Sequence, residues 1–472
     1  MNHEEIAYLS AVEAAELVRR RKLSPVELVA AVVDRIERIN PALNAFTTYD
    51  ADGAMEAARR AEDDVARGAE LGPLHGVPVS IKDILYVKDS RTTFGSKLFE
   101  HNVTTEDAPS IARLRRAGAI FIGRTNTPEF GWKGVTDNRV FGVTRNPWDR
   151  DLTPGGSSGG ASAAVAAGLG PIGMGTDGGG SIRIPAAFCG LVGHKPSFGR
   201  VPNYPATAAD SLRHTGALTR TVADAALTLS VLAGPDERDP SSLPDDGVDY
   251  LAELDRGIDG VRIAYSPDLG YARVEPEVAG LCEKAAMRLG EAGAAVERIT
   301  LDWEDPYDCW RVFFYGGVSG FLEGRLAKEG DLLDPGLRKV VEEGTRLRAA
   351  DYVGALFARN AFWQKVRAVF ERYDLLVTPA LAVTPFAVGK NDADPPIGQS
   401  QRPLRWSPFT YPFNLTGQPA ASVPCGWTGA QLPVGLQVVG RRFDDVAVLR
   451  AARALEQIEP WANRRPPVGE AT

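Results

Sequence analysis

Short apolar segments of strand length alternate along this chain with longer segments of helical periodicity. Residues 77–87 are mostly apolar and alternate poorly between apolar and polar side chains, which is typical of a buried strand that leads into a loop. Residues 107–124 combine an arginine-rich helical pattern, a stop at Gly118 and a second apolar strand. Because alternating helices and buried strands pack as layers, the sequence predicts an α/β fold built on a sheet.

Further elements are indicated on both sides of this region. Residues 10–40 predict two helices, with Ser10 as the cap of the first and Ser24-Pro25 as the start of the second. Residues 161–169 are small and apolar and predict a helix that can pack its backbone closely against a sheet.

The second half of the chain changes character twice. Residues 235–260 are rich in Pro, Asp and Ser, and residues 275–375 look predominantly helical, so we expect this stretch to form a cap. Residues 420–424 and 433–439 again have strand patterns and precede a helix over 444–458, which indicates a return to the central sheet.

Length and charge bound the class of protein. The chain has 472 residues, of which 44% are hydrophobic and 24% charged, so it can bury a large core without disulfides. At about 150 residues per domain three domains are allowed, but large α/β enzymes often form one unit, and the domain number stays open. The net charge is −8 and the basic residues are scattered, which argues against a nucleic-acid partner.

The cysteines and the hydrophobic segments point to no metal and no membrane contact. Cys189, Cys282, Cys309 and Cys425 lie far apart, without a Cys-x-x-Cys pair or histidines at zinc-ligand spacing, so we expect reduced, mostly buried thiols. The first residues lack the basic start and apolar run of a secretory signal, and no segment reaches the ~18 apolar residues of a membrane span. These features predict a cytoplasmic protein.

Three short stretches carry candidate chemistry. They are Lys82 in Ser-Ile-Lys-Asp, the string Gly155-Gly-Ser-Ser-Gly-Gly160, and Gly175-Thr-Asp-Gly-Gly-Gly-Ser-Ile-Arg-Ile-Pro185. A single strand lysine is more often an edge or salt-bridge residue, and a Gly-Ser string is often a linker, although apolar segments flank this one closely and favour an ordered turn. In the third stretch, three glycines before Ser181 free the backbone to present several amides to one point, which suits an oxyanion. A phosphate-binding loop is disfavoured because the Gly-x-x-x-x-Gly-Lys-Ser/Thr pattern is absent.

In this order and at these separations, the three stretches closely resemble the amidase signature family. Its hallmark is a Gly- and Ser-rich block that runs into Gly-Thr-Asp-x-Gly-Gly-Ser-Ile-Arg-x-Pro. The resemblance spans most of the chain and leaves only about 240–400 without recognisable motifs. Its other motifs are Leu23-Ser-Pro-Val-Glu-Leu28, Asn146-Pro-Trp148, Gly193-His-Lys-Pro196, Asn414-Leu-Thr-Gly-Gln-Pro419 and Leu432-Pro-Val-Gly-Leu-Gln437.

The resemblance implies a Ser-cisSer-Lys triad that needs neither histidine nor cofactor. Ser181 would attack the carbonyl, Ser157 would pass its proton on, and Lys82 would accept it. Lysine acts as a base only when burial lowers its pKa enough to leave it neutral, and a buried strand meets that condition. The family holds the peptide before the bridging serine in cis, which we expect here at Gly156–Ser157.

The resemblance also assigns the surroundings of the nucleophile. The amides of Gly178, Gly179, Gly180 and Ser181 would form the oxyanion hole, with Gly178 at a position where relatives often carry a larger residue. Supporting residues outside the reacting groups would be Thr176, Asp177 and Arg183, and the last two could pair across the turn and fix its shape or could be idle surface charges.

For the whole chain, the resemblance implies one large domain over 1–472 in which helices surround a central twisted mixed sheet. Within it we expect a signature core over 75–235, a mainly helical cap and substrate region over 240–400, and a return to the core sheet over 401–472.

The histidines do not support the usual serine-hydrolase alternative, because none of the five lies in a Gly-x-Ser-x-Gly context. His194 replaces the leucine common in the family's Gly-Leu-Lys-Pro, and a structural role is favoured for it and for His75. Asp83 should point to the other face of the strand from Lys82 and meet a loop.

The residues around Phe130, Gly131 and Trp132 occupy the place where family members shape the acyl side of the pocket. We therefore expect Gly131 and Trp132 to contact a small apolar or aryl substrate. Aromatics in the region without motifs have the spacing of one helical face and could be either core or lid; they are Trp310, Phe313, Phe314 and Tyr315.

The predicted activity is hydrolysis of the C–N bond of a carboxylic amide, an anilide or a related carbamate or ester through a seryl acyl-enzyme, acting on a small molecule, with a homodimer left open. One alternative is the glutaminase-type A subunit of the glutamyl-tRNA(Gln) amidotransferase. It is disfavoured because Thr127-Pro-Glu-Phe-Gly131 replaces the Met-Asp-Glu-Phe stretch of such subunits. A second alternative, a non-catalytic binding protein, is disfavoured because Lys82, Ser157 and Ser181 are all present.

Overall fold

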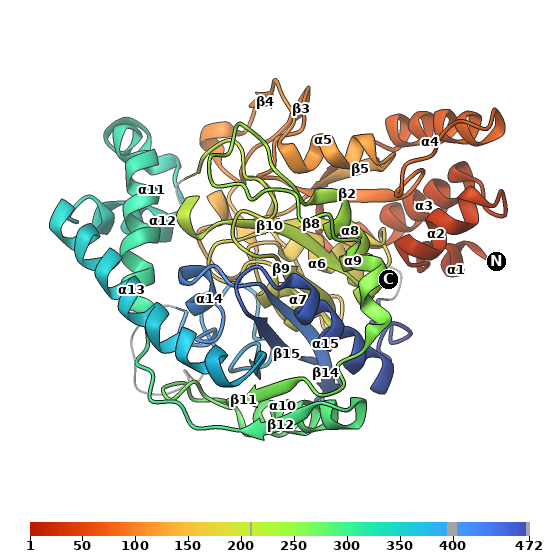
Figure 1. Cartoon of the computed structure of the whole chain (residues 1–472). Helices are drawn as coiled ribbons and strands as arrows, with labels where there is room; N and C mark the ends of the chain where they lie inside the picture. Colours follow the sequence, from red (N-terminus) through yellow and green to blue (C-terminus); the bar gives the residue numbers. More distant parts are fainter. Residues whose placement is uncertain (208–209, 394–403, 469–472) are drawn as a thin grey trace.

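The computed structural model describes residues 1–207, 210–393 and 404–468 (Figure 1). Among these residues, eleven strands form one sheet in the order β1-β5-β2-β8-β10-β9-β14-β15-β13-β11-β12. The pairs of β2 with β5 and β8, and of β11 with β12 and β13, are parallel, and the other pairs are antiparallel. The predicted α/β fold with a central mixed sheet is therefore confirmed.

The strands of the sheet are β1 (Phe46–Tyr49), β2 (Pro78–Lys82), β5 (Ile120–Thr125), β8 (Ile172–Asp177), β9 (Val192–Lys195), β10 (His214–Thr219), β11 (Arg262–Tyr265), β12 (Ala295–Arg298), β13 (Leu375–Pro379), β14 (Ala420–Trp427) and β15 (Pro433–Gly440). Two further strand pairs lie outside it, β3 (Ser90–Arg91) with β4 (Val103–Thr104) and β6 (Asp137–Asn138) with β7 (Gly142–Val143).

The α-helices are α1 (His3–Ala7), α2 (Ala11–Arg19), α3 (Pro25–Leu43), α4 (Ala51–Ala66), α5 (Pro109–Arg116), α6 (Gly159–Ala166), α7 (Arg183–Cys189), α8 (Val222–Leu232), α9 (Tyr250–Glu253), α10 (Pro276–Arg288), α11 (Tyr307–Glu329), α12 (Pro335–Gly344), α13 (Ala349–Arg372), α14 (Pro412–Leu415) and α15 (Asp445–Ile458). None of those described is long and apolar enough to cross a membrane.

Local sequence signals determine where the predicted N-terminal helices begin. Ser10 and Ser24 each accept a hydrogen bond from the third amide of their helix, and the glutamate at that position bonds back to the cap. These capping boxes satisfy amides that have no partner within a helix, and Pro25 starts α3 with its backbone angle already set. The two helices expected over residues 10–40 are thus confirmed.

Strand β2 brings Lys82 to the interior and then leads into a turn, as predicted. The amides of Ile84 and Leu85 both donate to the carbonyl of Lys82, at 2.7 and 3.0 Å, and this turn ends the strand. Val79 and Ile81 pack in the core with α5 and α8. Side chains alternate between the faces of a strand, so Lys82 points the other way, toward the start of α6.

Helix α6 lies against the sheet at very close range. All eight of its residues are buried. A Cβ on Gly160 would lie 2.3 Å from the backbone nitrogen of Asn126, and one on Gly173 of β8 would lie 3.1 Å from Ala161. The small residues, which we expected to allow close packing, are therefore necessary for the close approach of α6 to the sheet.

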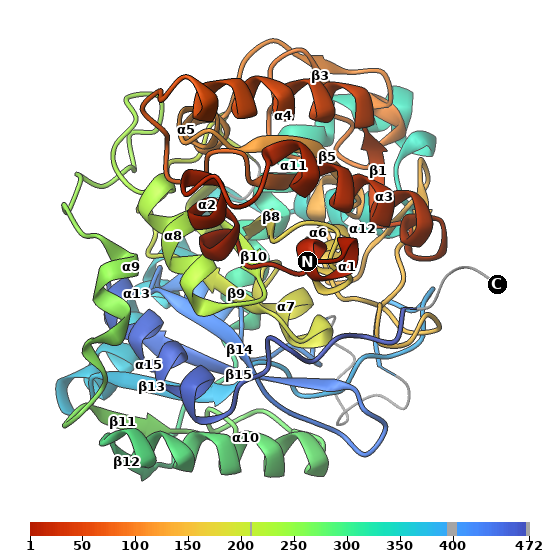
Figure 2. The ribbon, with the colours of Figure 1, turned by 90° about the vertical axis from the view of Figure 1, so that its right-hand side faces the viewer.

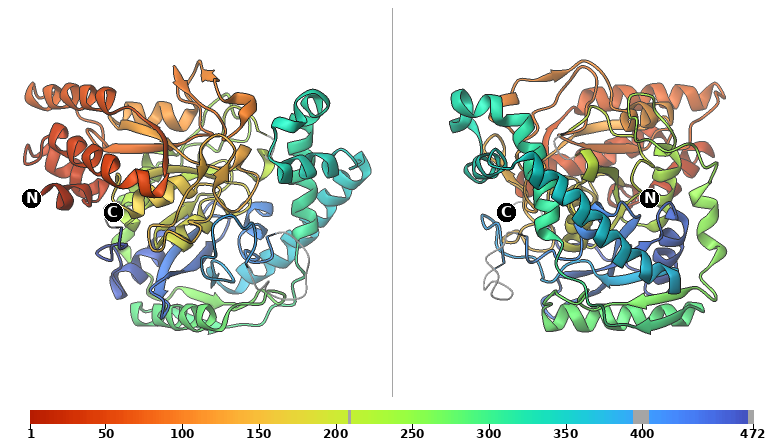
Figure 3. Two further views of the ribbon diagram at one scale, coloured as in Figure 1. Left: turned by 180° about the vertical axis from the view of Figure 1, so that it is seen from behind. Right: turned by 60° about the vertical axis from the view of Figure 1, so that its left-hand side comes forward.

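The region 240–400 supplies strands as well as helices. β11, β12 and β13 complete one edge of the sheet, where α10 packs against β13, β14 and β15 (Figure 2). Helices α12 and α13 both pack on α11, at the opposite end of the molecule from α1–α4 (Figure 3). The rest of this expected region, 394–400, lies outside the described residues, as do 401–403 of the expected C-terminal return.

Candidate active site

Lys82 is fully buried at the end of β2 and is surrounded by hydroxyl groups. Its Nζ lies 2.6 Å from Ser157 Oγ, 2.9 Å from Ser158 Oγ and 2.9 Å from Thr176 Oγ1. Burial lowers the pKa of Lys82 well below its usual value, and the positive charge of Arg213 lowers it further. An amine that is neutral and within hydrogen-bond distance of a serine hydroxyl can accept the hydroxyl proton.

Ser157 lies in the turn that precedes α6, with its hydroxyl between Lys82 and the adjacent pocket. The Gly156–Ser157 peptide is cis, as expected. A Cβ on Gly156 would lie 2.7 to 2.8 Å from the backbone of Val135, so only glycine fits there. The amide of Ser158 donates to the carbonyl of Ser181 at 3.2 Å, which joins this turn to the loop that carries the predicted nucleophile.

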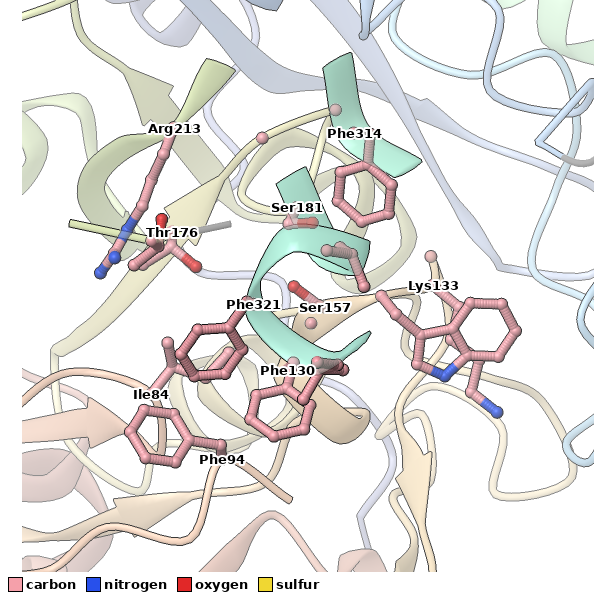
Figure 4. A pocket seen from close by; sticks show the side chains of 18 of the residues that line it. Ile84, Phe94, Phe130, Lys133, Ser157, Thr176, Ser181, Arg213, Phe314 and Phe321 are labelled. Carbon is pink, nitrogen blue, oxygen red and sulfur yellow. The ribbon is translucent and has the colours of Figure 1, made fainter. Parts of the chain in front are cut away.

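Ser181 lies between the end of β8 and the start of α7, and its side chain faces the same pocket as Ser157 and Thr176 (Figure 4). Ser181 is partly exposed, whereas Lys82 is completely shielded. A substrate in this pocket can reach Ser181, while Lys82, which lies behind Ser157 and Thr176, is shielded from solvent.

The amides of the glycine loop are not all available to a substrate. The Gly180 amide donates to Asp177 Oδ1 at 2.7 Å. It is therefore not free to bind an oxyanion, in contrast to the expectation that Gly180 contributes to the oxyanion hole. The reason is that the Asp177 side chain turns back over its own loop and accepts a hydrogen bond from the Gly180 amide. The amides of Gly178, Gly179 and Ser181 make no hydrogen bond to any part of the chain that the structure describes.

Two side chains from distant segments hold the carbonyls of the same loop. Trp310 Nε1 donates to the Gly178 carbonyl at 2.9 Å, and Thr410 Oγ1 donates to the Gly179 carbonyl at 2.6 Å. A Cβ on Gly179 would lie 2.8 Å from Cζ2 of Trp310. The indole therefore lies directly on the backbone of the loop.

A buried ion pair fixes the loop from beneath. Arg183 Nη2 lies 2.9 Å from Asp177 Oδ1, and both side chains are fully shielded. Burial alone would raise the pKa of Asp177, but the charge and hydrogen bonds of Arg183, with smaller contributions from Lys195 and Asn414, together outweigh it and hold the pKa below its usual value. Arg183 also donates to Asn414 Oδ1 and Gln437 Oε1, at 2.7 and 2.8 Å. The expected pairing across the turn is present, and the charges are buried rather than on the surface.

The pocket in front of Ser181 has mostly apolar walls. Phe94 stacks on Phe130 at 5.9 Å, and Phe321 of α11 meets the edge of Phe130 at 5.7 Å. Figure 4 shows these rings on one side of the cavity and Phe314, also from α11, near Ser181. Among the described residues that line it, none is acidic and the cations are Lys133 and Arg213.

Gly131 and Trp132, the expected substrate contacts, both line this pocket. A Cβ on Gly131 would lie 3.0 Å from Ser157 Oγ, and the residue has a positive φ of 70°. A side chain at this position would crowd the hydroxyl of Ser157 and strain the backbone.

Comparison with known proteins decides the family. The family described as Amidase matches residues 27–449. An acylamidase of Rhodococcus erythropolis is 40% identical and covers 99% of this chain and 98% of its own length. The A subunit of the glutamyl-tRNA(Gln) amidotransferase of Moorella thermoacetica is 38% identical and covers 99% and 100%. The crystal structure of a bacterial aryl acylamidase of the amidase signature enzymes superposes with a TM-score of 0.91 at 33% identity, over 96% of this chain and 97% of that one.

This chain belongs to the amidase signature family.

Membership makes it a hydrolase of amide C–N bonds and identifies its mixed sheet as the amidase signature fold. The motifs that define the family are the ones that the fold gathers at the pocket. β2 brings Lys82, the turn before α6 brings Ser157, and the loop after β8 brings Ser181.

Several contacts of this amidase site were not predicted from the sequence. Ser158 contacts Lys82 as closely as Thr176 does, and its place in the Gly-Ser string was a usable signal. Asn414, which bonds both Asp177 and Arg183, lies in a motif that the resemblance had already marked. Trp310 and Thr410 lie outside the motifs, and nothing in the local sequence indicates their contacts with the loop.

The four aromatic residues of α11 for which the sequence left core or lid open all pack in the core that α11 forms with α12 and α13. Two of them, Trp310 and Phe314, line the pocket as well.

The other residues considered in the sequence lie away from the reacting groups. Asp83, just after β2, bonds Thr93 in a loop, as expected, and also pairs with Arg124 of β5, which was not expected. His194 is buried on β9 with its Nε2 3.4 Å from Asp445, and burial together with Lys195 lowers its pKa to about 3. His75 contacts the Ala61 carbonyl at 3.0 Å.

Proposed function

We propose that this amidase cleaves small amides with an apolar or aryl acyl part, through an acyl-enzyme on Ser181. The observation that carries the proposal is the 2.6 Å contact of the buried Lys82 Nζ with Ser157 Oγ, on the wall of the pocket that Ser181 lines. A shielded neutral amine next to a hydroxyl is what a serine nucleophile needs for activation in the absence of histidine.

In the first half-reaction, Ser181 Oγ attacks the substrate carbonyl and forms a C–O bond. Its proton passes to Ser157 Oγ while Ser157 gives its own proton to Lys82 Nζ. The carbonyl oxygen becomes an oxyanion, which the free amides of the glycine loop stabilise. As the C–N bond breaks, the proton returns through Ser157 to the departing amine.

In the second half-reaction, water takes the place of the amine. The relay removes one proton from the water, and the resulting hydroxyl adds to the ester carbon. Collapse of this intermediate breaks the bond to Ser181, and the proton held by Lys82 returns through Ser157 to restore the Ser181 hydroxyl. The products are the carboxylic acid and the free enzyme, and no cofactor takes part in the sequence of steps.

The walls of the pocket support the choice of substrate class. Phe94, Phe130 and Phe321 form an aromatic surface on one side, and Trp132 and Phe314 add further aromatic lining. Such rings stabilise a bound aryl or alkyl group by burying its surface and by edge or offset stacking. Anilides, carbamates and esters with the same acyl part fit the same chemistry.

The alternative is glutamine hydrolysis as the A subunit of an amidotransferase, which the 38% identity to such a protein keeps under consideration. Glutamine carries an ammonium and a carboxylate, and the described pocket lining offers no acidic residue to pair with the ammonium. We therefore favour apolar amides. Hydrolysis of glutamine, measured as ammonia release, that is faster than hydrolysis of aryl amides would reverse this preference.

The assignment of the nucleophile is tested with a fluorophosphonate probe and a panel of aryl and alkyl amides. Ser181→Ala should abolish both turnover and labelling while the far-UV circular dichroism spectrum stays unchanged. Cys189→Ala is a control at a second nucleophilic atom, which unlike Ser181 is fully buried, because burial raises the pKa of the Cys189 thiol to about 12 and keeps it inert. Labelling that persists in Ser181→Ala would overturn the assignment.

A further inference from the structure

We infer that Trp310 of α11 is a positioning residue of the oxyanion hole: it fixes the amide of Gly179, which together with that of Ser181 is directed at the substrate oxygen. The inference rests on the proposed role of Ser181 and concerns a helix that carries none of the family motifs.

The argument starts from the planarity of the peptide group. In a trans peptide the C=O of one residue and the N–H of the next point in opposite directions in one plane. A donor that holds a carbonyl therefore fixes the direction of the following amide. In the glycine loop, Trp310 Nε1 holds the Gly178 carbonyl at 2.9 Å, which fixes the Gly179 amide on the opposite side of that plane.

The next two peptide groups are held in the same way. Thr410 Oγ1 holds the Gly179 carbonyl at 2.6 Å, and the amide that this fixes, that of Gly180, donates to Asp177. The Gly180 carbonyl accepts from the Ile184 amide at 2.7 Å, in the first turn of α7, and this fixes the amide of Ser181.

The three fixed planes give an alternating pattern. The Gly180 amide is used inside the protein, whereas the amides of Gly179 and Ser181, like that of Gly178, have no partner in the described chain. All three of these residues line the pocket. Two donors separated by one residue can converge on a single oxygen, which is the geometry that an oxyanion requires.

Trp310 is held rigidly enough to serve this purpose. Its ring stacks on Phe314 with centroids 4.8 Å apart and planes at 11°, and it also contacts Tyr307 and Tyr411 at 5.8 Å. Trp310 is only 3% exposed. Because the ring faces the backbone of Gly179 at contact distance, any side chain at that position would displace it.

The proposal predicts a loss of turnover when only the N–H group is removed. The sulfur isostere of tryptophan, 3-benzothienylalanine, incorporated at position 310, keeps the two rings and lacks the donor. We expect kcat for an aryl amide to fall about 10-fold or more, since loss of an oxyanion donor typically costs more than this. KM should change by less than about 2-fold because the apolar walls are intact, and Trp310→Phe should lower kcat in the same direction.

A matched control separates this role from simple structural support. Trp461 is also buried, and its Nε1 donates to the Arg220 carbonyl at 3.0 Å, away from the pocket. The same isostere at position 461 should leave kcat unchanged, even where it lowers the thermal midpoint. The rate of fluorophosphonate labelling should fall with the isostere at 310 and not at 461, because the phosphonyl oxygen uses the same amides.

An unchanged kcat with the isostere at 310 would overturn the inference. That outcome differs from failure of the proposed function, which would appear in the unmodified enzyme as labelling at a residue other than Ser181.

Discussion

A lysine that is shielded from water gives up its proton at a lower pH than a lysine on the surface. Burial and the charge of Arg213 both lower the pKa of Lys82, while Asp177 partly opposes them. The amine is neutral above this lowered pKa and charged below it. Activity should therefore be present above the folded-state pKa and be lost as the pH falls through it.

The pH dependence of kcat/KM tests this prediction. Below the pKa of Lys82, kcat/KM should fall by about 10-fold per pH unit, and the midpoint should lie well under the ordinary value of 10.5. Lys82→Ala should leave at most a trace of activity at every pH. A rate in Lys82→Ala close to that of the wild type would exclude the relay through Ser157.

The same shift affects stability. Between the lowered pKa and 10.5 the unfolded chain binds a proton that the folded chain does not, so Lys82 makes the unfolding free energy rise with pH over this window. The lysine thus destabilises the folded state at neutral pH, a cost that accompanies its use as a base.

Single residues were predictable where a short motif determines their surroundings. Lys82, Ser157 and Ser181 are brought to one site, and Asp177 and Arg183 pair across six residues. The bond of the Gly180 amide to Asp177 was not predictable, because residue types alone do not reveal which way each peptide plane turns. The hydrogen bond of Trp310 to the loop was not predictable for a different reason: its partner lies 132 residues away in the sequence.

Helix α6 shows how the sequence of one element sets its distance from the sheet. A methyl group on Gly160 would meet the backbone nitrogen of Asn126 at 2.3 Å and the Ala45 carbonyl at 2.6 Å. We predict that Gly160→Ala lowers the unfolding free energy by about 1–3 kcal/mol or more, because the helix must move away from β5.

Gly280 of α10 provides the matched helical glycine. It is exposed, and a Cβ there would have no neighbour within 4 Å. Gly280→Ala should raise the unfolding free energy by about 0.5–1 kcal/mol through the better helix propensity of alanine. Urea titrations of both variants measure the two effects, and equal effects would show that close packing does not decide them.

Elements with local signals were predicted well, and those that depend on distant partners were not. The capped helices α2 and α3 and the strands β14 and β15 lie close to the expected residues. Strands β11, β12 and β13 are only four or five residues long and lie among long helices. Their strand conformation comes from pairing within the sheet, which no short window of sequence contains.

One sheet runs through the whole molecule, and the region 240–400 contributes an integral part of it. Strand β13 lies between β15 and β11 and pairs with β15 along its full length, from Leu375 to Pro379. The core that contains β2 also contains Ile263 of β11 and Val377 of β13. Loss of this region would expose the interior of the remaining sheet.

We therefore predict that the chain unfolds as one cooperative unit. Tryptophan fluorescence, from eight tryptophans between positions 132 and 461, and far-UV circular dichroism should report the same midpoint in urea. Calorimetric and van't Hoff enthalpies should agree in a thermal scan. A separate early transition seen by only one probe would instead identify 240–400 as an independent domain.

The glycine string around the nucleophile owes its shape to partners scattered over most of the chain. Its carbonyls are held by Trp310, Thr410 and the first turn of α7, and its carboxylate by Arg183 and Asn414. The segment 175–185 consequently cannot form this site by itself. If residues 175–185 were transferred to another protein without α11 and the segment before α14, they would keep the same side chains. Their amides would no longer be held in the directions that they have here.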